Sequence, residues 1–450
     1  MAMRITTNGV FRGYRSDLNN SFSKMQKSMT RVTTQRNFGS YAEDVSAASR
    51  AFQLRRSHWR TDTQVNNSNY VISKFQTAWT AIDYIVDGEG SEDNLNGIVE
   101  SLRGLNSPTG SARVTLGESV LAKAESIVRL MNSQYGDQFI FAGADARNVP
   151  FTWETDGTDG STYLAYRGID VSTPVGMTEN EIKDHLIVKH VEADTEAVPP
   201  VNEHWEISYD EALAKQGFVP LDTTEYTSAA DAETALQGIL NDTTQEFENY
   251  KTQFDDIYAS FTHGEGSAYE NGRKLYDMSQ EATYVDIGLG LDWDENGDLI
   301  SSSAYNAALN GLSFLGFGST LGEDGELHSN NLAVLMREMG EMLKSCDPKT
   351  GAYPEDWNAD RATSLTRAIE SSVNDVTVQH IRLSNEANYL QTNLLQLTAQ
   401  RDTLNTQILD IEQIDPADAI TEYMYARYAY NAALSVGSSI LTNTLLDYLR

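Results

Sequence analysis

The chain lacks several features that would otherwise define its class. Cys346 is the one cysteine in 450 residues, so no internal disulfide can form and the fold needs no oxidation. No run of about 18 apolar residues occurs, which excludes a membrane-spanning helix. Arg4 and Arg12 are not followed by an apolar stretch, so we expect no cleaved secretory signal peptide.

Basic residues are scarce, because 33 Lys and Arg face 65 Asp and Glu and give a formal net charge of -32. Such an acidic chain is a poor partner for nucleic acid, whose phosphates need clustered Lys and Arg, and for an anionic membrane surface. The charge is uneven. Residues 1–80 carry 12 basic and 4 acidic side chains, a net of +8, whereas residues 145–300 carry 8 and 33, a net of -25.

Proline is absent from long stretches near both ends of the chain. None occurs in residues 1–107 or 355–415, whereas five of the nine fall in residues 150–220. Because proline interrupts helices, this distribution predicts terminal helices with a different domain inserted between them.

A heptad repeat of apolar residues runs through the C-terminal flank. Its positions alternate in steps of four and three, and only His380 and Arg401 interrupt its apolar character. The pattern is typical of a coiled-coil seam about six repeats long, and the helix would measure roughly 65 Å. A helix of that length needs a partner along its seam. The positions are Ile369, Val373, Val376, His380, Leu383, Ala387, Leu390, Leu394, Leu397, Arg401, Leu404, Ile408 and Ile411.

Candidate partners for this helix lie nearer the N-terminus. Asp415 followed by Pro416 also predicts the N-cap and first turn of a last helix. We therefore expect the two ends of the chain to pair as a coiled-coil bundle. The apolar stripes are Phe22, Met25, Met29 and Val32; Phe75, Trp79, Ile82 and Val86; and Val120, Ile127, Met131 and Tyr135.

These patterns predict a mainly α fold, in which terminal coiled-coil helices form a helical rod and an α+β domain is inserted. Turn signals at Asp156-Gly157 and Asp159-Gly160 predict strands in the insert. We expect a coiled-coil assembly segment at 1–60 that pairs with a C-terminal assembly helix at 412–450. The expected rod domain has two parts, 61–144 and 301–411, around an acidic α+β insert at 145–300.

The last helix carries no charged side chain from Tyr428 to Leu446, although its Ser, Thr and Asn residues make it too polar for a membrane anchor. It could be buried against its own chain or between subunits. We favour the second, because an uncharged terminal helix without partners would fray. The expected assembly interface, for which packing within one chain is the alternative, is Phe22, Met25, Met29, Val32, Leu434, Leu441, Leu445 and Leu449.

Several segments resemble the axial proteins of the bacterial flagellum. Residues 3–6 (Met-Arg-Ile-Thr) resemble the opening of that family, and residues 24–29, 36–37 and 46–51 resemble its first amphipathic helix and the loop after it. Two segments favour the hook–filament junction proteins, the hook-associated protein 3 family, over flagellin. They are residues 135–143 (Tyr-Gly-Asp-Gln-Phe-Ile-Phe-Ala-Gly) with 150–151, and the end of the chain, 429–434 through 445–449.

The resemblance covers about residues 1–151 and 310–450, including Gly311, Leu312 and Gly316, but not the insert. It implies export through the flagellar type III apparatus without cleavage, and an extracellular location in the flagellum. It also implies a short ring of subunits between the hook-side junction protein and flagellin. The implied partners are therefore copies of the chain itself, these two proteins, and a cytoplasmic export chaperone that holds the C-terminal helix.

One acidic segment resembles the first part of a calcium loop. Asp292, Asp294, Asn296 and Asp298 place side-chain oxygens at alternate positions, with glycine at the sixth. Ser303 occupies the twelfth position, where a bidentate Glu is expected, so an acidic β-turn is the alternative. A flat calorimetric titration with calcium would contradict the calcium hypothesis.

No other pattern indicates catalysis or cofactor binding. The seven histidines lack zinc-site spacing, and Gly316, Gly318 and Gly322 do not match a dinucleotide fingerprint. We therefore expect no enzymatic activity and no cofactor. The leading hypothesis is a structural subunit of the flagellum at the hook–filament junction, with flagellin as the alternative within that class. An alternative of another class is a surface adhesin or calcium-binding protein that acts through residues 145–300.

Overall fold

The computed structural model describes residues 7–88, 94–104, 110–157, 160–193, 202–322, 325–354 and 359–448. The chain is mostly helical, at 62%, its long terminal helices pack together, and the middle of the sequence forms an α+β region, which confirms the predicted fold class. Among the described residues, no helix is long and apolar enough to cross a membrane.

The helices occupy the following ranges: α1 Thr7–Thr34, α2 Val45–Val86, α3 Leu95–Arg103, α4 Gly110–Met131, α5 Glu179–His185, α6 Glu211–Ala214, α7 Ala229–Asn241, α8 Thr244–Tyr258, α9 Ala268–Ser279, α10 Gly311–Leu315, α11 Leu332–Lys344, α12 Ala359–Glu412 and α13 Pro416–Tyr448. The strands are β1 Gln134–Tyr135, β2 Gln138–Phe139, β3 Phe151–Thr155, β4 Thr162–Tyr166, β5 Ile169–Asp170, β6 Leu186–Val191, β7 His204–Tyr209, β8 Tyr284–Val285, β9 Tyr305–Asn306, β10 Ser319–Leu321 and β11 Leu327–Ser329. Every pairing between these strands is antiparallel.

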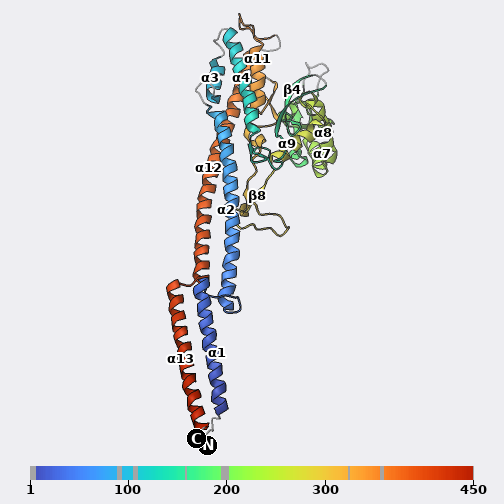
Figure 1. The fold of residues 1–450 in the computed structure, drawn as a ribbon. Coiled ribbons are helices and arrows are strands. Elements are labelled where there is room, and N and C mark those ends of the chain that lie inside the picture. The colour runs from blue at the N-terminus through green and yellow to red at the C-terminus, as the bar shows by residue number, and fades with distance from the viewer. Residues whose placement is uncertain are drawn as a thin grey trace. The chain divides into compact units, whose positions relative to one another are not determined.

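The chain divides into two compact units. Unit 1 comprises residues 1–69, 286–288 and 391–450, and unit 2 comprises residues 70–285 and 289–390. In unit 1, α1 lies beside α13 (Figure 1), and the first part of α2 lies with the last part of α12.

The heptad seam predicted along α12 is confirmed, since each of its thirteen positions is buried or half-buried. Its two polar positions face side chains of α2. The His380 ring stacks on Trp79 with centroids 5.2 Å apart and lies 3.5 Å from the Asp83 carboxylate. Arg401 lies 3.7 Å from Asp62. The seam therefore accepts a polar residue wherever α2 provides an aromatic face or a carboxylate.

The partner of α4 is α11, and two glycines allow these helices to approach closely (Figure 1). A Cβ atom on Gly117 would lie 2.6 Å from the Lys344 nitrogen and 2.8 Å from the Gly340 oxygen. A Cβ atom on Gly340 would lie 2.6 Å from Leu121. Backbone therefore packs on backbone at this crossing, which only glycine permits.

The middle region contains a sheet in the order β3-β4-β5 and a separate hairpin of β6 and β7. The turn after β3 is closed by a bond from the Asp156 nitrogen to the Ser161 oxygen at 2.8 Å, as the Asp-Gly signals predicted. On β4, burial and a bond to Glu154 raise the pKa of Tyr163 to about 12. The Tyr163 ring stacks on His263, whose Nδ1 lies 2.7 Å from the buried Asp170 carboxylate. This contact ties the sheet to the chain that follows α8.

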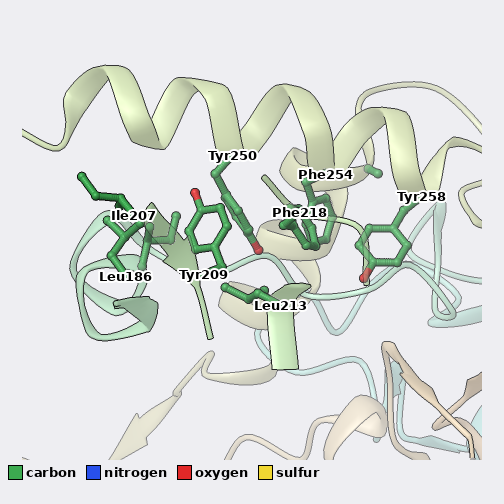
Figure 2. Close-up of a cluster of buried hydrophobic side chains, with 10 residues drawn as sticks. Leu186, Ile207, Tyr209, Leu213, Phe218, Tyr250, Phe254 and Tyr258 are labelled. Carbon is green, nitrogen blue, oxygen red and sulfur yellow. The ribbon is translucent and has the colours of Figure 1, made fainter. Parts of the chain in front are cut away.

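Aromatic side chains form the core of the helical part of the middle region. In Figure 2, Tyr250, Phe254 and Tyr258 project from α8 toward Tyr209 and Phe218. The Phe218 ring stacks on Tyr250 with centroids 4.9 Å apart. This packing gives the acidic middle region an apolar centre of its own.

A buried carboxylate fixes the edge of that core. Glu246, on α8, accepts hydrogen bonds from the Tyr209 hydroxyl at 2.7 Å and from the Leu221 nitrogen at 3.0 Å. Burial, followed by the bond to Glu246, raises the pKa of Tyr209. Both donors are needed, because a buried carboxylate without them would destabilise the fold.

Candidate assembly surface on the terminal helices

The contact face of α1 follows a heptad pattern. Apart from Arg31, the less exposed of its described side chains lie at positions that alternate in steps of three and four. Such a stripe faces one neighbouring helix along its whole length. Its members are Phe11, Tyr14, Leu18, Ser21, Met25, Ser28 and Val32.

The contact face of α13 is made of small residues and tyrosines. Its members repeat every seven residues in two sets, Ala419, Ala426 and Ala433, and Tyr423, Tyr430 and Gly437. Small side chains allow α1 to approach closely, and the tyrosines fill the spaces between them. The interface predicted from the sequence did not include this face, because that prediction was based on the leucines of the last helix. The seven-residue repeat of alanine and tyrosine could have indicated it.

Tyr14 of α1 fits into this face of α13. Its hydroxyl donates a hydrogen bond to the Ala433 carbonyl at 3.0 Å. Its ring occupies the space where any side chain at position 437 would lie, so Gly437 is required at this contact. Nearby, the Phe22 and Tyr430 rings have centroids 5.5 Å apart. Tyr14 is thus the main anchor of α1 on α13.

The predicted interface residues divide into three groups. Met25 and Val32 lie half-buried in the α1–α13 contact. Phe22, at 46% exposure, and Met29, at 52%, lie at its edge, and Leu434 is also exposed. The side chains of Leu441 and Leu445, and the whole of Leu449, lie outside the described residues. Within the chain, α1 therefore packs on the Ala/Tyr face of α13, and contacts of the predicted residues between chains remain a prediction.

A short connection joins the pair to the helices that follow. The Asn37 side-chain nitrogen donates to the Ile411 and Gln413 carbonyls, both at 2.9 Å, and its backbone nitrogen donates to the Glu412 oxygen at 2.8 Å. Glu412 also forms an ion pair with Arg55 of α2. The segment after α1 is thus fastened to the turn between α12 and α13.

Replacing Asn37 by alanine should lower the stability of this connection by about 1–2 kcal/mol, because two side-chain hydrogen bonds are lost. Asn37→Asp should cost more, because a carboxylate would face two carbonyl oxygens. Urea denaturation followed by circular dichroism measures both effects. Asn20→Ala, at an exposed position of α1, is the matched control and should cause no loss of stability, because alanine favours a helix. Equal stability of all three variants and the original chain would contradict the role of Asn37.

Many large apolar side chains of unit 1 remain uncovered. Monomeric proteins rarely expose so many within one unit, and large patches of this kind usually mark an interface with another protein. The exposed side chains are Phe22 and Met29 on α1; Val45, Phe52 and Trp59 on α2; Leu395 and Leu409 on α12; and Ile420, Met424, Tyr425, Tyr428, Leu434 and Val436 on α13.

The uncovered side of α13 is itself apolar. Ile420, Met424 and Tyr428 follow one another at intervals of four residues and are exposed. On a helix this spacing forms a ridge, and by helical periodicity the ridge turns away from the face that contacts α1. A helix that is apolar on more than one face is normally buried on all of them. The chain by itself covers one face of α13.

The calcium hypothesis concerned residues that form the tip of a hairpin. The Asp294 carboxylate accepts hydrogen bonds from the Asn296 and Asp298 nitrogens, both at 2.9 Å, and so closes the turn. Among the described residues, no group of three or more His, Cys, Asp or Glu side chains could hold a metal ion. Calcium binding by Asp292, Asp294, Asn296 and Asp298 remains a hypothesis.

One segment that favoured the junction proteins, residues 135–143, meets the start of the second stretch of the flagellar resemblance, although the two are about 170 residues apart in the sequence. The Gly311 nitrogen donates to the Phe141 oxygen at 2.8 Å, and the Gly143 nitrogen donates to the Leu309 oxygen at 3.0 Å. The Phe141 and Phe314 rings have centroids 5.3 Å apart. Gly311 has no room for a side chain, because a Cβ atom there would overlap the ring of Phe151.

Comparison with known proteins identifies the class of the chain. Residues 5–87 match the family model of the bacterial flagellin N-terminal helical region, a stretch that includes the whole of α1, the Asn37 connection and the whole of α2. Residues 5–87 therefore carry the N-terminal helical region of the flagellin family, and this match supports an axial protein of the bacterial flagellum. No curated protein matches the chain.

Members of this family are structural and non-enzymatic, and they self-assemble with other axial proteins in the extracellular flagellum. The match does not distinguish a junction protein from a flagellin.

Proposed function

We propose that the chain is a hook–filament junction subunit of the hook-associated protein 3 family, which builds a short ring between the hook-side junction protein and flagellin. The assembly role is supported by the exposure of apolar side chains on α13. This helix is apolar on more than one face, and the chain covers one of these faces. Neighbouring subunits would cover the ridge of Ile420, Met424 and Tyr428.

The choice of the junction protein over flagellin is supported by residues 135–143 with 150–151, one of the two segments that favoured it in the sequence. Residues 135–151 and 310–316 pack on one another through Phe141, Gly143 and Gly311. A segment that favoured the junction protein thus contacts a second stretch that resembles the flagellar axial proteins in general. Flagellin remains the alternative within the class.

Before export, α13 needs protection, because its apolar ridge would otherwise associate with other proteins. A cytoplasmic chaperone that binds this helix would provide that protection. The chain would then leave the cell unfolded and uncleaved through the flagellar type III apparatus. The expected neighbours outside the cell are further copies, flagellin and the hook-side junction protein.

The decisive experiment is to count copies of the chain per sheared flagellum by quantitative mass spectrometry against the main filament protein. We expect a small fixed number that does not change with filament length. A number that grows with length would identify a flagellin. Absence from flagella together with presence on the cell surface would favour an adhesin acting through residues 145–300.

A further inference from the structure

Two exposed aromatic residues on α2 flank an arginine. Phe52 is 64% exposed and Trp59 is 70% exposed. Arg56 lies four residues after the first and three before the second, so the three side chains share one face of the helix. Arg56 is exposed and forms no ion pair with any described residue. We call Phe52, Arg56 and Trp59 the α2 face.

A second exposed tryptophan is held at the tip of a hairpin formed by residues 291–300. Trp293 pairs with Leu299 across the hairpin, and the Ile300 nitrogen donates to the Asp292 oxygen at 2.9 Å. The Asp294 nitrogen donates to the Asp298 oxygen at 2.8 Å. Trp293 is 60% exposed although the turn that holds it is well ordered by these bonds. The hairpin therefore presents a preformed aromatic side chain to solvent.

The α2 face and the hairpin carry opposite charges. Residues 45–61 contain four arginines and no Asp or Glu. Within the chain, Arg55 pairs with Glu412 and Arg60 lies 3.9 Å from Asp286, whereas Arg50 and Arg56 are exposed. Residues 289–303 contain Asp292, Asp294, Glu295 and Asp298 and no Lys or Arg. An arginine between aromatic rings suits a partner that offers both a tryptophan and carboxylates, because it can stack on the ring and pair with the acid.

We propose that the hairpin of one copy of the chain docks on the α2 face of another copy, with Trp293 beside Trp59 and Glu295 near Arg56. The inference rests on the proposed function in that it requires copies to assemble. It adds a contact outside the terminal helices α1 and α13. Tryptophan and arginine are the residues that most often dominate such contacts.

Cysteine cross-linking in flagella tests the contact directly. Cells that make both the Trp59→Cys chain and the Trp293→Cys chain should give, after oxidation of purified flagella, a disulfide-linked species of twice the chain mass. Neither chain alone should give it, since the native Cys346 is buried. Trp59→Cys combined with Val219→Cys, a cysteine at an exposed apolar position elsewhere, is the matched control and should give none.

Charge reversal provides a second test that needs no cysteine. Arg56→Glu and Glu295→Arg should each lower the number of copies per flagellum about tenfold, since close charge pairs at interfaces contribute on this scale. The two changes in one chain should restore it. Arg50→Glu is the control, because Arg50 is also exposed but lies about 120° round the helix from Arg56.

The outcomes separate this inference from the proposed function. Flagella that contain both cysteine chains without the mixed disulfide, or a normal copy number for Arg56→Glu and Glu295→Arg, would overturn the docking contact and leave the junction role intact. Equal cross-linking in the Val219→Cys control would also overturn it. Absence of the unmodified chain from flagella would overturn the proposed function and this inference with it.

Discussion

Replacing Gly437 by leucine should separate α13 from α1 and abolish assembly. A side chain at this position would overlap the Tyr14 ring, whose hydroxyl is held by the Ala433 carbonyl. To avoid this overlap, either the Tyr14 ring must leave the contact or α13 must move away from α1. We expect a cost of about 3 kcal/mol, the upper part of the range for overpacked sites, which corresponds to roughly a 100-fold loss of pairing.

The number of chains per sheared flagellum and the helix content of the purified chain measure this effect. Gly13→Leu is the matched control, because Gly13 is next to Tyr14 and has nothing within 4 Å of its would-be Cβ atom. That variant should assemble normally. Tyr14→Ala should partly rescue Gly437→Ala by removing the ring. Normal assembly of Gly437→Leu would show that the α1–α13 pair is not needed.

The same glycine-to-alanine change should have opposite effects at two helical sites. Gly117→Ala places a Cβ atom against backbone atoms of Lys344 and Gly340, so α4 and α11 must move apart, and we expect a loss of about 3 kcal/mol or more. Gly238 lies on the exposed side of α7, with open space around the position of a Cβ atom. Gly238→Ala should gain up to about 1 kcal/mol from helix propensity.

Thermal and urea unfolding of the full chain, followed by circular dichroism, measures both variants. Gly117→Val should be worse than Gly117→Ala, because its two γ-carbons meet the same backbone. If Gly117→Ala unfolded at the same urea concentration as the original chain, the close approach of α4 and α11 would be contradicted. A destabilised Gly238→Ala would instead contradict the open environment assigned to α7.

The seam of the long helix α12 could be predicted residue by residue, whereas the contact face of α13 is marked only by the weaker signal of a seven-residue repeat of alanine and tyrosine. Along α12 the seam consists mostly of leucine, isoleucine and valine, so the heptad pattern is strong and its helix must find a partner. Along α13 the contact residues are alanine, tyrosine and glycine, which carry little hydrophobic signal. The exposed ridge of Ile420, Met424 and Tyr428 carries more, so reasoning from hydrophobicity points to the side that α1 leaves uncovered.

The sequence therefore predicted that the terminal helices pair, but it predicted only some of the residues in their contact. The pairing of the chain ends followed from their periodicity and from the absence of proline. Met25 and Val32 lie in the contact within the chain, whereas Phe22, Met29 and Leu434 remain exposed and available to neighbours. The anchor, Tyr14 against Gly437, has no short-range signature, because it depends on two residues 423 positions apart.

The sequence by itself determined the mainly helical class, the paired ends and the acidic α+β middle region, because these follow from local periodicity and composition. Tertiary structure alone decided which face α1 covers on α13, how Asn37 fastens the ends together, and that Phe141 meets Gly311. It also decided that Trp293 and Trp59 both point into solvent. These contacts join residues that lie far apart in the sequence. Local sequence patterns do not distinguish between the helix faces that could pair, whereas close packing of the side chains in the folded protein allows one pairing.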